Sequence, residues 1–156
     1  AMRAVEPIVR RDPKRWLPEM RPWIEDEDRW VRRTGATVVG RLPMKHRRYT
    51  NACLALIEPL LVAEETEVKK AVSFAIRLCA RGDVDAVRGF LEQHVPPTDP
   101  AETWVLCDVV RKMSKKQLPM LRSLLPRFDA WSADPGLDSG GRRSVESVVR
   151  VLRGIH

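Results

Sequence analysis

The stretch VKKAVSFAIRLCAR (residues 68–81) has the spacing of an amphipathic helix and decides the fold. On a helical wheel its apolar residues form one stripe, made of Val68, Ala71, Val72, Ala75 and Cys79. Lys70, Arg77 and Arg81 lie on the other side, and Phe74 lies among them, roughly 120° from the centre of the stripe. A ring placed between cations, away from the core side, makes this face a candidate binding surface.

The helical period recurs along the rest of the chain, with no convincing alternating strand. Signals for helix starts occur at Asp12–Pro13, Thr50, Thr66, Asp83, Asp99–Pro100 and Ser114, and further helices are predicted within 26–42 and 142–155. Gly82 is predicted to cap the C-terminus of the helix that starts at Thr66. We therefore predict an all-α fold of about eight helices, each of roughly 10–17 residues.

Two features favour an α-solenoid over a four-helix bundle. Prolines fall in or near the helices, at Pro18, Pro22, Pro59, Pro119 and Pro126, and proline kinks help stacked helices to curve around their neighbours. Residues 23–43 and 131–152 form an internal repeat of Trp, an acidic turn, Arg-Arg and a Val-rich helix, in which Arg33 corresponds to Arg143. We predict a single helical-repeat domain over residues 1–156.

Composition limits the class of protein. The 156 residues include 28 Lys and Arg against 21 Asp and Glu, which gives a net charge of +7. Such a chain either binds a polyanion or merely has a basic, soluble surface. No apolar run approaches the roughly 20 residues of a membrane span, and no secretory signal is visible. We expect a cytoplasmic protein without membrane association.

The residues that most often bind metals or form disulfides are few and scattered. Cys53, Cys79 and Cys107 lack C-x-x-C spacing and are predicted to be buried free thiols in a reducing cytoplasm. The histidines, His46, His94 and His156, show no metal-ligand spacing, so no metal site is predicted.

Three helices carry an aromatic ring beside charges on the side away from the apolar stripe. With the last helix, they supply the candidate DNA-binding residues Trp30, Arg33, Lys70, Phe74, Arg77, Arg81, Trp104 and Arg143. Cations and exposed flat rings together suit a nucleic acid, because cations bind phosphates and rings contact sugars and bases. The alternative is that each ring packs on the next layer of helices, but cations beside it are costly to bury without partners.

Asp108 shares a side of its helix with Trp104 and Arg111. It is the candidate catalytic carboxylate. The alternative is a helix-surface acid that is paired with Arg111 or Lys112.

The segments WVRRTGA (30–36) and VKKAVSFAIRLCARGDVDAVRGFLEQH (68–94) resemble the bacterial HEAT-like DNA alkylation repair family, the alkylpurine DNA glycosylases. That family shows a Trp-x-Arg-Arg helix start and then a Lys-Ala-x-x-Trp-Ala-x-Arg helix, and here Phe74 stands in place of the second Trp. The similar stretch spans about 65 residues. The resemblance implies a right-handed α-solenoid of HEAT-like helical hairpins that holds double-stranded DNA, including alkylated DNA, on a basic concave face.

The resemblance also implies an activity. Members of the family hydrolyse the N-glycosidic bond of N3- or N7-alkylated purines without flipping the base and without a metal or organic cofactor. Arg33 would hold a phosphate, Arg77 would be a second basic contact, and Phe74 one of two aromatic contacts. The family carboxylate, in a Trp-x-x-x-Asp motif, would stabilise positive charge that develops on the sugar.

That motif lies roughly 35 residues before the phosphate-holding arginine in the family. Counting back from Arg33 passes the start of the sequence, so we expect the N-terminal half of the family fold to be missing from it. Trp104 and Asp108 form a Trp-x-x-x-Asp motif 35 residues before Arg143, which places the motif in the second repeat.

Two classes of function follow from these observations. The first is a DNA-binding protein of the alkylation-repair type, with glycosylase activity left open. The alternative is a non-catalytic helical-repeat scaffold that binds a protein partner or forms a homodimer through an exposed end layer.

Overall fold

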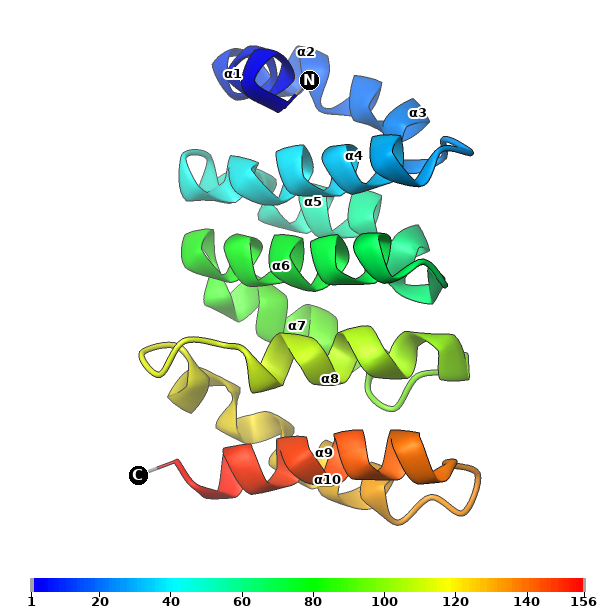
Figure 1. Ribbon diagram of the computed structural model, residues 1–156. Helices are drawn as coiled ribbons and strands as arrows, with labels where there is room; N and C mark the ends of the chain where they lie inside the picture. The colour runs from blue at the N-terminus through cyan, green and yellow to red at the C-terminus, as the bar shows by residue number, and fades with distance from the viewer. Residues whose placement is uncertain (1, 156) are drawn as a thin grey trace.

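The computed structural model describes residues 2–155, and every regular element in that part of the chain is helical (Figure 1). The α-helices are α1 (Met2–Arg11), α2 (Pro13–Trp16), α3 (Arg21–Ile24), α4 (Arg29–Arg41), α5 (Thr50–Ile57), α6 (Thr66–Gly82), α7 (Val84–His94), α8 (Thr103–Arg111), α9 (Leu125–Ser132) and α10 (Ser139–Arg153). Short 3-10 helices lie at Pro18–Met20, Leu42–Met44, Arg47–Tyr49, Glu58–Val62, Pro100–Glu102 and Leu118–Leu124. The prediction of an all-α fold is confirmed. None of the described helices is both long and apolar enough to span a bilayer.

The helices lie in two rows. Helices α4, α6, α8 and α10 lie one below another, nearest the viewer in Figure 1, and are called the front row here. Helices α5, α7 and α9 lie behind them and form the back row. Within the front row α6 packs against both α4 and α8, and α8 packs against both α6 and α10. Each of these two middle helices therefore has neighbours on two flanks.

An acidic residue precedes every front-row helix at a nearly constant interval. The N-cap residues are Asp28, Glu65, Glu102 and Asp138, spaced by 37, 37 and 36 residues. The offset of 110 residues between Arg33 and Arg143 equals three of these steps, and Asp28 and Asp138 are separated by the same offset. The last turn of each helix carries an arginine. Acids at the start and cations at the end both suit the helix dipole.

The segments of the back row are shorter than the sequence predicts. The helix expected from Thr50 to about Val62 becomes 3-10 after Ile57, and the helix expected from Ser114 is a turn, a 3-10 segment and α9. A proline occupies the first or second position of each new segment. Because proline lacks the N–H that continues the hydrogen-bond ladder, these prolines divide the helices rather than bend them.

The first helices also differ from the prediction. Asp12 does cap a helix, since its Oδ1 accepts a hydrogen bond from the Arg15 N–H, but that helix ends at Trp16. Pro18 and Pro22 then begin new segments. Helix α1, which packs against α4, was not predicted.

Two glycines allow backbones to approach closely. A Cβ atom at Gly40 would lie 2.6 Å from Cα and 2.7 Å from Cβ of Ala75, so α4 and α6 touch there. Gly82 was predicted to be a C-cap, but it lies in the last turn of α6 and its φ is not positive. A Cβ there would overlap the carbonyl group of Pro43. The C-cap prediction was wrong, because the position requires close approach rather than a left-handed backbone.

The prediction that the cysteines are buried and free is confirmed. Cys53, Cys79 and Cys107 are free and fully buried. Burial raises the pKa of the Cys53 and Cys107 thiols to about 12, and it raises the pKa of Cys79 as well.

Candidate nucleic-acid interface

Four of the predicted DNA-binding residues line one groove between α4 and α6. Trp30 and Arg33 come from α4, and Lys70 and Phe74 come from α6. The groove has a volume of about 680 Å³. Trp30 and Phe74 are 50% and 36% exposed, so neither ring is covered by a further layer of helices as the alternative interpretation requires.

Cations lie over both rings. The guanidinium of Arg33 is 5.9 Å from the centre of the Trp30 ring, and that of Arg77 is 5.6 Å from the centre of the Phe74 ring. Cation–π contacts of this length orient a guanidinium while leaving its N–H groups available. The groove therefore combines apolar surface with positively charged hydrogen-bond donors.

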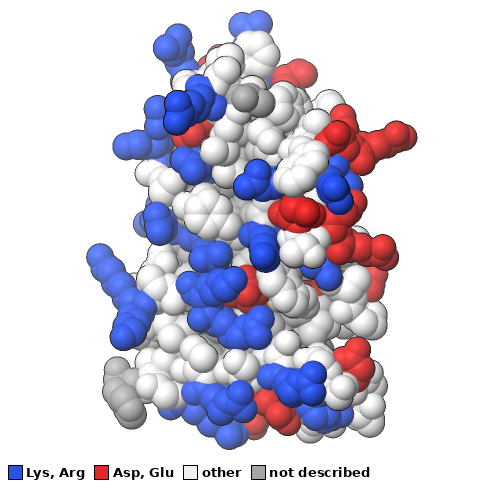
Figure 2. Space-filling view, in the orientation of Figure 1, with Lys and Arg blue, Asp and Glu red and all other residues white. Residues whose placement is uncertain are grey.

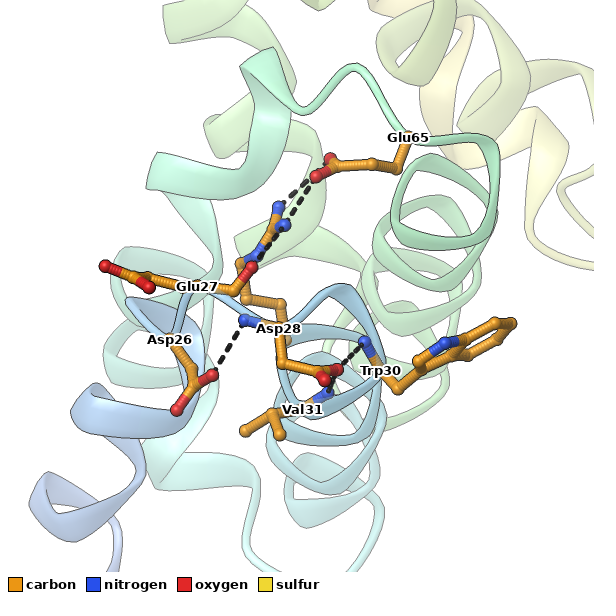
Figure 3. A network of polar contacts seen from close by, with 7 residues as sticks. Asp26, Glu27, Asp28, Trp30, Val31 and Glu65 are labelled. Carbon is orange, nitrogen blue, oxygen red and sulfur yellow. Dashed lines mark hydrogen bonds and ion pairs between the residues drawn. The ribbon is translucent and has the colours of Figure 1, made fainter.

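A polar network fixes the start of α4 against the start of α6 (Figure 3). Asp28 Oδ1 accepts hydrogen bonds from the N–H groups of Trp30 (2.7 Å) and Val31 (3.3 Å), which makes Asp28 a side-chain N-cap. The guanidinium of Arg32 donates to both carboxylate oxygens of Glu65 and to the carbonyl of Glu27. The side chain of Trp30 points away from this network. The network thus places α4, with its groove residues, relative to α6.

The Arg32–Glu65 pair is the ionic contact of this network. The hydrogen bonds from Arg32 lower the pKa of Glu65 to about 2, and the same contact raises the pKa of Arg32. A bidentate pair of this kind fixes geometry as well as charge.

The remaining predicted residues lie outside this groove. Trp104 lines a separate pocket between α8 and α10, and Arg81 lines a third with Arg47 and Asp83. Arg143 is exposed on α10. Arg77 is partly buried, and burial lowers its pKa although the charge of Asp108 raises it.

Asp108 was expected on the outer side of its helix and is instead 3% exposed. Its Oδ2 accepts a hydrogen bond from Ser73 Oγ of α6 at 2.6 Å. Its Oδ1 lies 3.2 Å from Lys112 Nζ and 3.5 Å from an Arg111 guanidinium nitrogen. The predicted pairing is therefore confirmed for both cations, but the expected exposure is wrong. A helical wheel gives only one core side, whereas α8 is flanked by two front-row neighbours.

Several groove residues were missed by the sequence interpretation, and Glu67 is the acidic one among them. Glu67 lines the groove with Trp30 and Phe74 and comes from the first turn of α6. Its spacing was available as a signal, because Glu67, Lys70 and Phe74 lie at i, i+3 and i+7 of one helix. A carboxylate among the cations of the groove was not considered.

Charge is unevenly distributed over the front-row face. Figure 2 shows acidic side chains gathered along the right edge, where α4 and α6 begin, and basic side chains across the centre and left. The last turns of the four helices contribute Arg41, Arg81, Arg111, Arg150 and Arg153. An anionic ligand on this face would be attracted to the centre and to the C-terminal ends of the helices.

His46 and His94 lie apart from the groove. His46 makes a hydrogen bond through Nε2 to the Arg10 carbonyl, and His94 lies 3.9 Å from carboxylate oxygens of Glu58 and Glu102. His156 is outside the described residues.

A protein-family model matches part of the chain. The model of a family described as DNA alkylation repair enzyme matches residues 1–102, which is 102 of the 156 residues. No curated protein and no solved structure matches the chain. The matched part includes α4 and α6 and ends one residue before α8 begins.

Proposed function

Because the chain belongs to the DNA alkylation repair enzyme family, which supports a function in DNA repair, we propose that it binds duplex DNA at the groove between α4 and α6. The observation that carries this proposal is the joint lining of the groove by Arg33, Lys70 and two exposed rings. Arg33 and Lys70 contact phosphates, and the rings contact the sugars or the base edges of an alkylated nucleotide. All of these residues lie in the part matched by the family.

The proposal also includes the arrangement of the helices. The step of 36 or 37 residues between the front-row N-caps is typical of paired helices in a repeat protein. We infer a right-handed HEAT-like solenoid in which each step adds one front-row helix and one back-row segment. A duplex lying across the row would contact successive front-row helices.

The reaction in the proposal is hydrolysis of the N-glycosidic bond of N3- or N7-alkylated purines. Such a purine is already cationic and is a good leaving group, so the protein has mainly to stabilise the positive charge that develops on the sugar. Glu67 is the carboxylate in the groove, whereas both oxygens of Asp108 are engaged by Ser73, Lys112 and Arg111. We therefore assign the charge-stabilising role to Glu67, and no metal or organic cofactor is invoked.

Binding is tested by the salt dependence of duplex affinity, measured by fluorescence anisotropy. Replacing both Arg33 and Lys70 by Gln should lower the slope of log K against log salt by about 1.8, since each phosphate contact contributes about 0.9. A matched double variant, Arg21→Gln with Arg88→Gln, removes the same charge from α3 and α7 and should leave the slope nearly unchanged. An unchanged slope in the first variant would refute the groove assignment. Weak salt dependence of the parent would favour the protein-binding scaffold instead.

The reaction is tested on a duplex that contains N7-methylguanine. Glu67→Gln should lower base release by roughly a hundredfold, in the range seen when one charge-stabilising group is removed. The same substitution should raise DNA affinity slightly, because it removes a negative charge beside the phosphates. Equal base release by the parent and Glu67→Gln would remove Glu67 from the mechanism.

A further inference from the structure

The part of the chain beyond the family match carries most of the net positive charge. Residues 103–156 contain ten Lys and Arg against five Asp and Glu, whereas residues 1–102 contain 18 against 16. This later part builds α8 and α10, which continue the front row below α4 and α6. The part beyond the match therefore has a net charge of +5, against +2 for the matched part.

A cluster of cations lies where α6 meets α8, around the buried carboxylate of Asp108. Arg111 and Lys112 both pair with Asp108 Oδ1, and the Nζ atom of Lys112 is also 6.0 Å from the centre of the Trp104 ring. Arg77 lies close enough for the charge of Asp108 to act on it, and its Nε is buried without a hydrogen-bond partner among the described residues. Two cations thus pair with one anion, and the charge of that anion also acts on a third cation.

The cluster has more positive charge than its own residues neutralise. Collecting cations in a partly buried place is unfavourable unless an anion compensates them. The Lys112 side chain is 52% exposed and that of Arg111 is 28% exposed, so a ligand from solvent can reach both. An anion with several oxygens on one exposed edge, such as a phosphodiester, fits this arrangement.

We propose that Arg111 and Lys112 form a second phosphate-contact site for duplex DNA, and that Asp108 is a positioning residue that holds them toward the ligand. The proposal rests on the proposed function and deepens it. It extends the DNA-contact face from the family-matched helices onto α8. Asp108 takes its orientation from the Ser73 hydroxyl of α6, so the site is fixed relative to Phe74 and Arg77 of the same helix.

The first test replaces both Arg111 and Lys112 by Gln in the full chain and measures its affinity for a duplex of about 20 base pairs, about 70 Å long. The slope of log K against log salt should fall by about 1.8, and affinity near 150 mM salt should fall roughly tenfold or more. The control is again Arg21→Gln with Arg88→Gln, for which neither value should change appreciably. A slope equal to that of the control would overturn the second site.

The second test uses Asp108→Asn, which keeps the shape of the side chain and raises the net charge by one. If Asp108 positions the two cations, both affinity and slope should decrease although the protein is more positive. If Asp108 only neutralises charge, affinity should increase, and that result would overturn the positioning role. Thermal unfolding by circular dichroism shows whether the variant is folded. If it is not, the Arg111 and Lys112 variant still decides whether the site exists.

The two proposals fail in different ways. If neither the Arg33 and Lys70 variant nor the Arg111 and Lys112 variant alters DNA binding, the proposed function is wrong. If only the first of them weakens binding, DNA binding stands and the second site is rejected. A reduction of similar size in both variants is the expected result.

Discussion

Helix α6 makes two different contacts within the front row. Toward α4 it meets a glycine, and the backbones touch where Gly40 faces Ala75 while an open groove with exposed rings remains beside the contact. On the side of α8, the Ser73 hydroxyl of α6 donates a hydrogen bond to the buried carboxylate of Asp108, and cations lie around this contact. The same row of helices therefore provides an aromatic groove on one flank and a charged cluster on the other.

This difference shows that the α4–α6 contact and the α6–α8 contact are stabilised in different ways. The contact between α4 and α6 depends on shape, with a bidentate ion pair only at its N-terminal end. The contact between α6 and α8 includes, besides apolar packing, a hydrogen bond between two buried polar side chains. Substitutions that change shape should affect the first contact, and substitutions that remove a donor should affect the second.

The largest effect is expected at Gly40. Gly40→Ala places a methyl group against the backbone of Ala75, which has to move, so the free energy of unfolding should fall by about 1–3 kcal/mol. Gly89→Ala, also in a helix, is the control, because a Cβ there meets nothing within 4 Å and the higher helix propensity of Ala should stabilise the protein by up to about 1 kcal/mol. Urea denaturation measures both. Equal changes in the two variants would contradict the close contact.

A smaller loss is expected at Ser73. Ser73→Ala removes the donor to Asp108 Oδ2 and leaves a buried carboxylate oxygen without this partner, which should cost about 1–3 kcal/mol, toward the lower end because two cations remain. Ser147→Ala on α10, where the side chain is only partly buried, should be close to neutral. Urea midpoints that coincide for the two variants would show that the hydrogen bond does not stabilise the contact.

The Arg32–Glu65 pair should contribute about 1 kcal/mol, because it is partly exposed to solvent. The pKa of Glu65 is about 2 in the folded protein and near 4.5 when unfolded, so ionised Glu65 favours the folded state. Its contribution is complete above about pH 5 and is lost as the pH falls toward 2. The difference in unfolding free energy between the parent and Glu65→Gln should therefore be larger at pH 7 than at pH 3. Glu25→Gln, at an exposed pair with Arg21, should show little difference at either pH. If the difference in unfolding free energy between the parent and Glu65→Gln were the same at pH 7 and pH 3, this role for Glu65 would be contradicted.

The smallest effect is expected for the thiols. Cys53, Cys79 and Cys107 have raised pKa values because they are buried, and a neutral, buried thiol reacts slowly. A disulfide reagent at pH 8 should label none of them in the folded protein and all three after unfolding. Rapid labelling of one thiol would reveal local opening of the contact that contains it.

The sequence was most informative where local chemistry is decisive. The start of α6 at Thr66, and the caps at Asp12, Asp83 and Asp99, follow from residues that are neighbours in the chain. The pattern of Phe74 among cations also predicted an exposed ring correctly. The 37-residue step was harder to recognise, because the four N-cap positions share acidity but few flanking residues.

The sequence was least informative where two helices meet. Asp108 was placed on the surface because a wheel describes one helix alone, and its partner Ser73 lies 35 residues away on another helix. Glu67 was missed for a related reason, since its place beside Trp30 depends on how α4 and α6 lie together. Gly82 was interpreted as a local cap although its role is contact with a distant backbone.

By itself the sequence determined that the chain is helical, that its cysteines are buried free thiols, and which faces carry rings and cations. These properties follow from periodicity, capping and composition, which act over a few residues. Only the tertiary structure decided that Trp30, Arg33, Lys70 and Phe74 share one groove. It also decided that Asp108 is buried and accepts a hydrogen bond from the Ser73 hydroxyl of α6. The physical reason is that burial and charge compensation depend on the helices on either side, and the packing of those helices is set by contacts between residues far apart in the chain.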